Sequence, residues 1–365
     1  MRAPDRLHLR PVLVGAVVAL AYAACADPIA PPDDPARPET ALGGATPVAG
    51  AATLEWQQVT RDLVIASRLN PITAGRAYAL VGMAQYAGVV AADRWADASA
   101  GGAGGDGGFV EPGGRAGYEA RRGAIAGASA TILGYLFPTA AAALEQRLVD
   151  DGNAGPGRTH PQFTRGVETG RAMGARVVSW GRTDGFTVAW TDPPWNGLPF
   201  PDPLHGGWTG VAGPPAGFQF PTMRPWYMTA PRQFRPGPPP SRYPTNSPEF
   251  TAELEAVRKA QRERTADSVA LANFWNLNVG TITTLGYWNV LASKYASEHA
   301  LGERDASHLF ALMNSAGLDA IIGCWDTKYH YLQLRPTQAD ATITIVPGVP
   351  GFPFPLPNHP AYPSG

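Results

Sequence analysis

Residues 307–336, SHLFALMNSAGLDAIIGCWDTKYHYLQLRP, carry apolar side chains at the spacing of an α-helix. Pro336 stops this pattern, because its ring removes a backbone N–H donor and restricts the residue before it. The sequence therefore predicts a strongly periodic helix that runs from about Ser307 to Leu334 and ends at Arg335-Pro336.

Much of the remaining chain has the same helical period. Ser247 is a suitable N-cap, since its hydroxyl can accept a hydrogen bond from the first turn of the helix after it. No alternation of strands with helices and no convincing set of period-two strands occurs, so the predicted fold class is all-α. We expect helices over 54–70, 72–96, 115–150, 164–186, 247–264 and 265–300, the last interrupted at Gly280 and Gly286.

The composition changes along the chain. Residues 1–25 have a basic start, an apolar run and small residues before Cys25, which indicates a signal peptide or a lipoprotein signal. Residues 26–50 are rich in Pro and Ala and predict a disordered tether. Residues 51–365 are expected to form the helical domain. Within it, sixteen of the 37 prolines fall between 191 and 248, so we expect a long loop there whose aromatic residues pack against the helices.

The N-terminal signal predicts an exported protein, periplasmic or anchored in the cell envelope by a lipid on Cys25. No later apolar run is long enough to span a bilayer, so contact with a membrane is expected only through that lipid. Once Cys25 is lipidated or removed, Cys324 is the one cysteine left, and we expect a small buried side chain there. The net charge of -1 gives no basic surface for nucleic acid.

Two cations near the end of the long helix are the main candidates for chemistry. Lys328 and Arg335 are seven residues apart, so on one helix they would share a face about 10 Å apart along its axis. They lie among apolar and aromatic residues, and two such cations repel each other unless an anion lies between them. A tetrahedral oxyanion fits, because arginine supplies a planar fork of donors and lysine a point charge. A solvated pair of cations is the alternative.

The residues next to Lys328 and Arg335 can have either a structural or a functional role. Trp325 lies one turn before Lys328 and can line a halide pocket or belong to the core. Asp326 and Asp340 flank the pair, and either can neutralise it, remain solvated or stabilise a helix end. Other aromatic residues at helical spacing are expected in the core, namely Phe274, Trp275, Tyr287 and Trp288.

Lys-x6-Arg-Pro at 328–336, succeeded by Pro-Ser-Gly at 363–365, resembles the first two signatures of the vanadium haloperoxidase and type 2 phosphatidic acid phosphatase superfamily. In that family the second signature ends in a histidine. Five longer blocks resemble the bacterial vanadium-dependent haloperoxidase branch: GVETGRAMGARVVSWGRTDG, PWYMTAPRQFRPGPPP, ERTADSVALANFWN, GTITTLGYWNVLA and DAIIGCWDTKYHYLQLRP. The resemblance covers most of the chain from about residue 55.

The resemblance implies a helical bundle with an oxyanion pocket at one end. Lys328 and Arg335 would bind the oxygens of vanadate, helped by the Ser364 hydroxyl and the Gly365 N–H. Vanadate is the implied cofactor, with hydrogen peroxide and a halide as small-molecule substrates. In the phosphatases of the same superfamily a phosphoester takes the place of vanadate.

The sequence ends before the histidines that the family uses, and we interpret it as truncated there. His359 can border the pocket, and His330 points to a different helix face from Lys328; neither is expected to replace a catalytic histidine. His160, His205, His299 and His308 show no metal-ligand spacing. The chain as given is therefore expected to be inactive, and three functions stay open: a haloperoxidase when complete, an acid phosphatase or phosphotransferase, and a non-catalytic remnant.

Overall fold

The computed structural model describes residues 50–99, 114–154, 160–189, 216–239 and 247–344. These residues form helices and no β-strand, which confirms the all-α prediction. The predicted signal and the tether lie outside the described residues and stay predictions. None of the described helices combines the length and hydropathy needed to cross a membrane.

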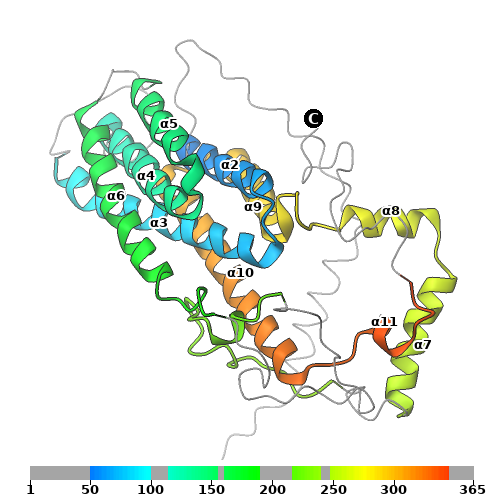
Figure 1. Ribbon diagram of the computed structural model, residues 1–365. Helices are drawn as coiled ribbons and strands as arrows, with labels where there is room; N and C mark the ends of the chain where they lie inside the picture. Colours follow the sequence, from blue (N-terminus) through cyan, green and yellow to red (C-terminus); the bar gives the residue numbers. More distant parts are fainter. Residues whose placement is uncertain (1–49, 100–113, 155–159, 190–215, 240–246, 345–365) are drawn as a thin grey trace, which may run out of the picture. The chain divides into compact units, whose positions relative to one another are not determined.

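The first five helices precede the proline-rich segment in the chain (Figure 1). Pro71 begins the second helix, where its missing N–H costs nothing, and the Asn70 side chain accepts a hydrogen bond from the N–H of Thr73. The predicted helix over 115–150 is interrupted, because Pro138 opens a short 3₁₀ turn, η1, Pro138–Ala140. The bounds are α2 Ala51–Ala66, α3 Pro71–Ser99, α4 Gly114–Leu136, α5 Ala141–Ala154 and α6 Pro161–Gly181.

The second set of helices comes after the proline-rich segment. Ser247 caps the first of them as predicted, by accepting the N–H of Phe250 at 3.1 Å. Gly280 lies in a break with φ 86°, but Gly286 does not interrupt its helix; there is no room for a Cβ beside the Tyr78 hydroxyl. The bounds are α7 Pro248–Arg262, α8 Ala266–Phe274, α9 Thr283–Glu298, α10 Glu303–Tyr331 and α11 Pro336–Ala339, with the 3₁₀ turn η3, Phe220–Thr222, before them.

Helices α4 and α6 pack in backbone contact through glycines (Figure 1). A Cβ on Gly127 of α4 would overlap the carbonyl oxygen of Val167, and one on Gly170 of α6 would overlap that of Ala124. Gly166, Gly170 and Gly174 occur at four-residue intervals and so line one face of α6. This seam brings two long helices closer than any side chain would allow.

Buried charges attach α10 to the bundle. Glu303, the first residue of α10, is fully buried, and its carboxylate accepts the N–H groups of Ala52 and Thr53 at 2.8 and 3.0 Å. It therefore caps the N-terminus of α2, where donors have no intrahelical partner. Asp93 of α3 accepts from Arg121 and from Arg304 of α10. Because α10 also packs along α3, the long helix is a fixed support for the proline-rich segment.

We predict that Gly127→Ala destabilises the bundle by about 1–3 kcal/mol, because the new methyl group forces α4 and α6 apart. Gly134→Ala in the same helix is the matched control, since its Cβ would lie 3.9 Å from the nearest atom, Ala141 Cβ. The control should be neutral or stabilising by up to about 1 kcal/mol through helix propensity. Urea unfolding of both variants checks this, and equal stabilities would contradict the glycine seam.

Candidate functional site

Residues 216–239, the described part of the proline-rich segment, are called the strap, and they lie against α10. The carboxylate of Asp319 accepts three consecutive backbone N–H groups of the strap: Trp226 and Tyr227 at 2.7 Å and Met228 at 3.0 Å. Asp319 is 4% exposed, so these charge-assisted bonds replace water at a buried charge. One side chain of α10 thus fixes a turn of the strap.

Two further turns of α10 hold the rest of the strap. Asp326, seven residues after Asp319 and on the same face, accepts both Nε and Nη2 of Arg235 at 2.7 Å. The Tyr331 hydroxyl donates to the carbonyl of Pro236 at 2.7 Å. The expectation that the aromatic residues of this segment pack against the helices is confirmed for Phe220, which is fully buried, but is wrong for Tyr227 and Phe234, which are exposed.

The start of the strap meets two aromatic residues of α10. Trp325 Nε1 and the Tyr329 hydroxyl both donate to the carbonyl oxygen of Ala216, at 2.8 and 2.9 Å. Gly217 comes next with φ 74°, and a Cβ there would overlap Trp325 Nε1. Burial raises the pKa of Tyr329 to about 12, although Arg335 lowers it. Tyr329 therefore stays neutral and keeps its proton to donate.

The two predicted cations adjoin this aromatic pair. The Lys328 ammonium lies 3.8 Å above the centroid of the Trp325 ring, and the Lys328 side chain is exposed. Arg335, also exposed, is near enough to Tyr329 to affect the pKa of its hydroxyl. Both cations are thus associated with residues that bind the Ala216 carbonyl.

The prediction that Lys328 and Arg335 share one helix is wrong. Helix α10 ends at Tyr331, because Leu332 adopts the left-handed conformation with φ 47° and ψ 46°. Arg335 is extended, with φ -71° and ψ 145°, and is the N-cap of α11. The residue before a proline is forced out of helical geometry, and here the helix ends still earlier than the proline requires. The cations therefore come from two elements joined by a sharp turn.

Both aspartates that could have neutralised these cations are bound elsewhere. Asp326 is occupied by the guanidinium of Arg235. Asp340 accepts Arg258 Nε at 2.6 Å. Among the residues that the structure describes, neither Lys328 nor Arg335 forms an ion pair. Neither aspartate therefore neutralises Lys328 or Arg335 in the structure.

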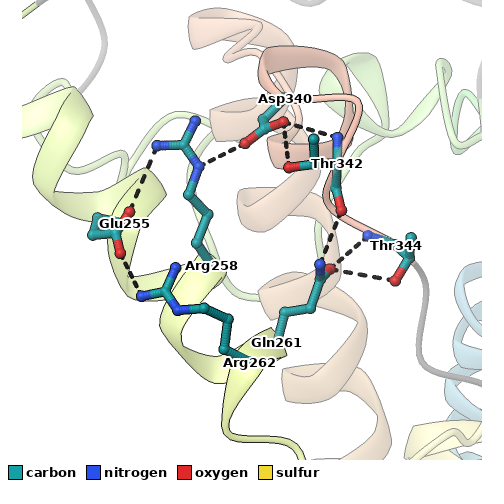
Figure 2. A network of polar contacts seen from close by, with 7 residues as sticks. All are labelled: Glu255, Arg258, Gln261, Arg262, Asp340, Thr342 and Thr344. Atoms are coloured by element: carbon teal, nitrogen blue, oxygen red, sulfur yellow. Dashed lines mark hydrogen bonds and ion pairs between the residues drawn. The ribbon is translucent and has the colours of Figure 1, made fainter.

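Figure 2 shows how the segment after α11 is held against α7. Asp340 accepts the Thr342 hydroxyl and N–H at 2.7 and 2.8 Å, besides Arg258. The Thr342 hydroxyl is the largest cause, ahead of its N–H and of Arg258, that lowers the pKa of Asp340 to about 2. Gln261 of α7 donates to the Thr342 carbonyl and accepts the Thr344 N–H. This network holds residues 340–344, the last described residues of the chain, against α7.

The remaining sequence predictions concern residues other than Lys328 and Arg335. Ser364, Gly365, His359 and Cys25 lie outside the described residues, so their roles stay predictions. Cys324 is exposed, which contradicts the expected buried thiol. It lies two residues from both Ile322 and Asp326, which are buried, and a helix turns through about 200° over two residues. Cys324 thus lies on the opposite face.

The expected aromatic core is only partly present. Tyr287 is buried, but Trp275 and Trp288 are 51% and 55% exposed. Trp288 and Tyr295, seven residues apart, share the outward face of α9. Helical spacing identifies a face without saying which side is inward, so the core prediction for the two tryptophans was wrong.

The histidines of the described residues have structural roles. His160 caps α6 by accepting the N–H of Gln162, His308 stacks on Tyr86, and His299 stacks on Tyr295. His330 is exposed and contacts the edge of Tyr331. In the described part of the chain, no group of three acidic, histidine or cysteine residues could hold a metal ion.

Sequence reasoning missed the strap contacts of Asp319, Arg235, Ala216 and Gly217. An aspartate between apolar residues in GLDAII signals a buried partner, but nothing in its spacing identifies three backbone N–H groups about ninety residues away.

No family model matches the chain, and no curated protein matches it. Solved structures do. A structure described as the first bacterial vanadium-dependent iodoperoxidase aligns with a TM-score of 0.59 and 21% identity over 80% of this chain and 72% of that one. A holo-type bacterial vanadium-dependent chloroperoxidase aligns with a TM-score of 0.54 and 15% identity, over 80% and 70%. These similarities establish a fold like that of the vanadium haloperoxidases.

We predict that Asp319→Asn weakens the strap, because the amide loses an acceptor oxygen and turns a donor toward backbone donors. The expected loss of stability is about 2–3 kcal/mol. Hydrogen exchange at the N–H groups of residues 226–228 should become faster. Asp305→Asn, exposed in the first turn of α10, is the control and should change stability by less than about 1 kcal/mol. Unchanged exchange at 226–228 in Asp319→Asn would contradict the anchoring role.

The lowered pKa of Asp340 makes its network sensitive to acid. Because the folded-state pKa lies below the ordinary 3.8, the carboxylate stabilises the fold above about pH 4, and this contribution is lost as the pH falls toward 2. We expect hydrogen-exchange protection of the Thr342 N–H, corrected for intrinsic rates, to fall over that interval. Asp340→Asn should remove the pH dependence. Protection that stays constant in the unaltered protein from pH 5 to 2 would argue against this network.

Proposed function

We propose that the chain binds a tetrahedral oxyanion at Lys328 and Arg335, and that the site serves a vanadate-dependent haloperoxidase. The observation that carries this proposal is the division of charge around the site. Asp326 and Asp340 are held by Arg235 and by Arg258, while Lys328 and Arg335 have no ion pair among the described residues. Unpaired cations next to a fixed aromatic surface favour an external anion.

The residues present fit vanadate by their donor chemistry. Lys328 offers three N–H donors on a mobile stem, and Arg335 offers a planar fork that matches two oxygens of a tetrahedral anion. Tyr329 stays protonated at neutral pH and keeps its hydroxyl on the Ala216 carbonyl. When bound, vanadate supplies the oxidation of a halide ion by hydrogen peroxide. The haloperoxidase-like fold supports this choice of anion.

Further groups complete the proposed site by resemblance. Ser364 and Gly365 would add a hydroxyl and a backbone N–H to the anion, with His359 at the border of the pocket. The proposed substrates are hydrogen peroxide and a halide, and the proposed location is outside the cytoplasm, in keeping with the N-terminal signal.

Phosphate has the same shape and a similar charge, so an acid phosphatase or phosphotransferase activity is the second candidate. The same observation favours it, because an unpaired lysine and arginine do not distinguish vanadate from phosphate. The two candidates differ in the reaction, which an assay separates.

We predict that orthovanadate binds the full chain and that Lys328→Ala weakens binding about 10-fold or more, the value of one charge-assisted hydrogen bond. Calorimetric titration measures this. Lys294→Ala is the matched control, because Lys294 is exposed on α9 and forms an ion pair with Glu298 at 3.8 Å, within its own helix. It should leave the affinity unchanged.

The contrary outcomes are distinct. If neither orthovanadate nor phosphate binds at millimolar concentration, the oxyanion site is wrong. If a protein that also carries the family's histidines releases phosphate from an aryl phosphate in a Lys328-dependent manner, without peroxide-dependent bromination of a phenol, the phosphatase candidate replaces the haloperoxidase.

A further inference from the structure

We infer that the backbone carbonyl of Ala216 is a positioning group for Lys328 of the oxyanion site, acting through Trp325, with Tyr329 bound to the same oxygen. This inference rests on the proposed function, and it assigns to the strap a part in anion affinity. Ala216 and Gly217 act only through the two rings and do not themselves contact the anion.

The Ala216 carbonyl is a hydrogen-bond acceptor that Trp325 and Tyr329 share. The Ala216 oxygen receives Trp325 Nε1 at 2.8 Å and the Tyr329 hydroxyl at 2.9 Å. A carbonyl oxygen has two lone pairs, so these two donors saturate it. The two rings lie one turn apart on α10, and each is prevented from rotating because its polar atom is bound to the same fixed point.

The turn that carries this acceptor is rigid. Gly217 has φ 74°, a conformation that favours glycine, and the space of its missing Cβ is filled by Trp325 and by Ile72. The Gly217 carbonyl accepts the N–H of Phe220 at 3.0 Å. Phe220 is fully buried, and its ring centroid lies 6.2 Å from that of Trp325. The turn is therefore part of a packed cluster and does not move independently.

The Trp325 ring in turn restrains Lys328. Lys328 is exposed, and a free lysine side chain loses conformational entropy when it binds an anion. Its ammonium already lies 3.8 Å above the Trp325 ring, which limits where it can go. A cation restrained in this way binds an anion more tightly than a mobile one.

Lysine acetylation tests the restraint without any ligand. The chain has three lysines, so Lys259 and Lys294 serve as internal references for Lys328. Trp325→Phe retains an aromatic face but removes the N–H that binds Ala216. We expect the acetylation of Lys328 to become about 2- to 5-fold faster in Trp325→Phe, as the ring ceases to shield one side of the amine. The reference lysines and the control Trp288→Phe, exposed on α9, should show no change.

Orthovanadate titration of the same variants tests whether the restraint strengthens anion binding. We expect Trp325→Phe to bind orthovanadate about 3- to 10-fold more weakly, since the variant loses the hydrogen bond that fixes the ring to the Ala216 carbonyl, a bond of ordinary strength. Tyr329→Phe removes only a hydroxyl, and we expect it to weaken orthovanadate binding as well. This variant therefore still tests the inference if Trp325→Phe fails to fold. Trp288→Phe should bind as the unaltered protein does.

The results separate this inference from the proposed function. If Lys328→Ala weakens binding while folded Trp325→Phe and Tyr329→Phe both retain full affinity, the positioning role is overturned and the oxyanion site stands. If the unaltered chain binds no orthovanadate, the proposed function fails. In that case the acetylation rates alone test whether the Trp325 ring restrains Lys328. An unchanged acetylation rate of Lys328 in Trp325→Phe overturns this restraint.

Discussion

The carboxylate of Asp319 and the three strap N–H groups that it accepts are the interaction on which the candidate site is built. A proline-rich segment has few donors of its own to form regular structure, so its course must be set by contacts with other elements. Asp319 supplies that contact from inside a long helix, where it is almost fully buried. Asp326 and Tyr331 bind the strap further along α10, and the Ala216 carbonyl of the strap binds Trp325 and Tyr329. Strap and helix therefore define one surface.

The distribution of charge on this surface explains why neither Asp326 nor Asp340 pairs with Lys328 or Arg335. A buried or half-buried carboxylate is costly unless a donor meets it, and here strap and α7 arginines meet the two nearest aspartates. Arg235 makes a bidentate pair with Asp326, a geometry that a lysine could not reproduce. Lys328 contacts the face of an aromatic ring, and Arg335 lies beyond a helix end. Under the proposed function, each position keeps the cation's donors for an anion.

Much of the fold was predictable from local sequence. Helical period, the Ser247 cap and the break at Pro71 arise from interactions within a few residues. Lys328 and Trp325, three residues apart on one helix, were placed correctly side by side. The position of Arg335 was not, because a left-handed Leu332 ends α10 before the proline does. Cys324 and Trp288 also escaped prediction, since the inward face of a helix depends on partners distant in the sequence.

A crystal structure of the full chain with orthovanadate would decide whether Lys328 and Arg335 form an oxyanion site. We expect one anion within hydrogen-bonding distance of Lys328 Nζ and of the Arg335 guanidinium. Asp326 should remain paired with Arg235, and the Ala216 carbonyl should still accept from Trp325 and Tyr329. An anion bound elsewhere, or Lys328 paired with Asp326 after release of Arg235, would contradict the oxyanion site.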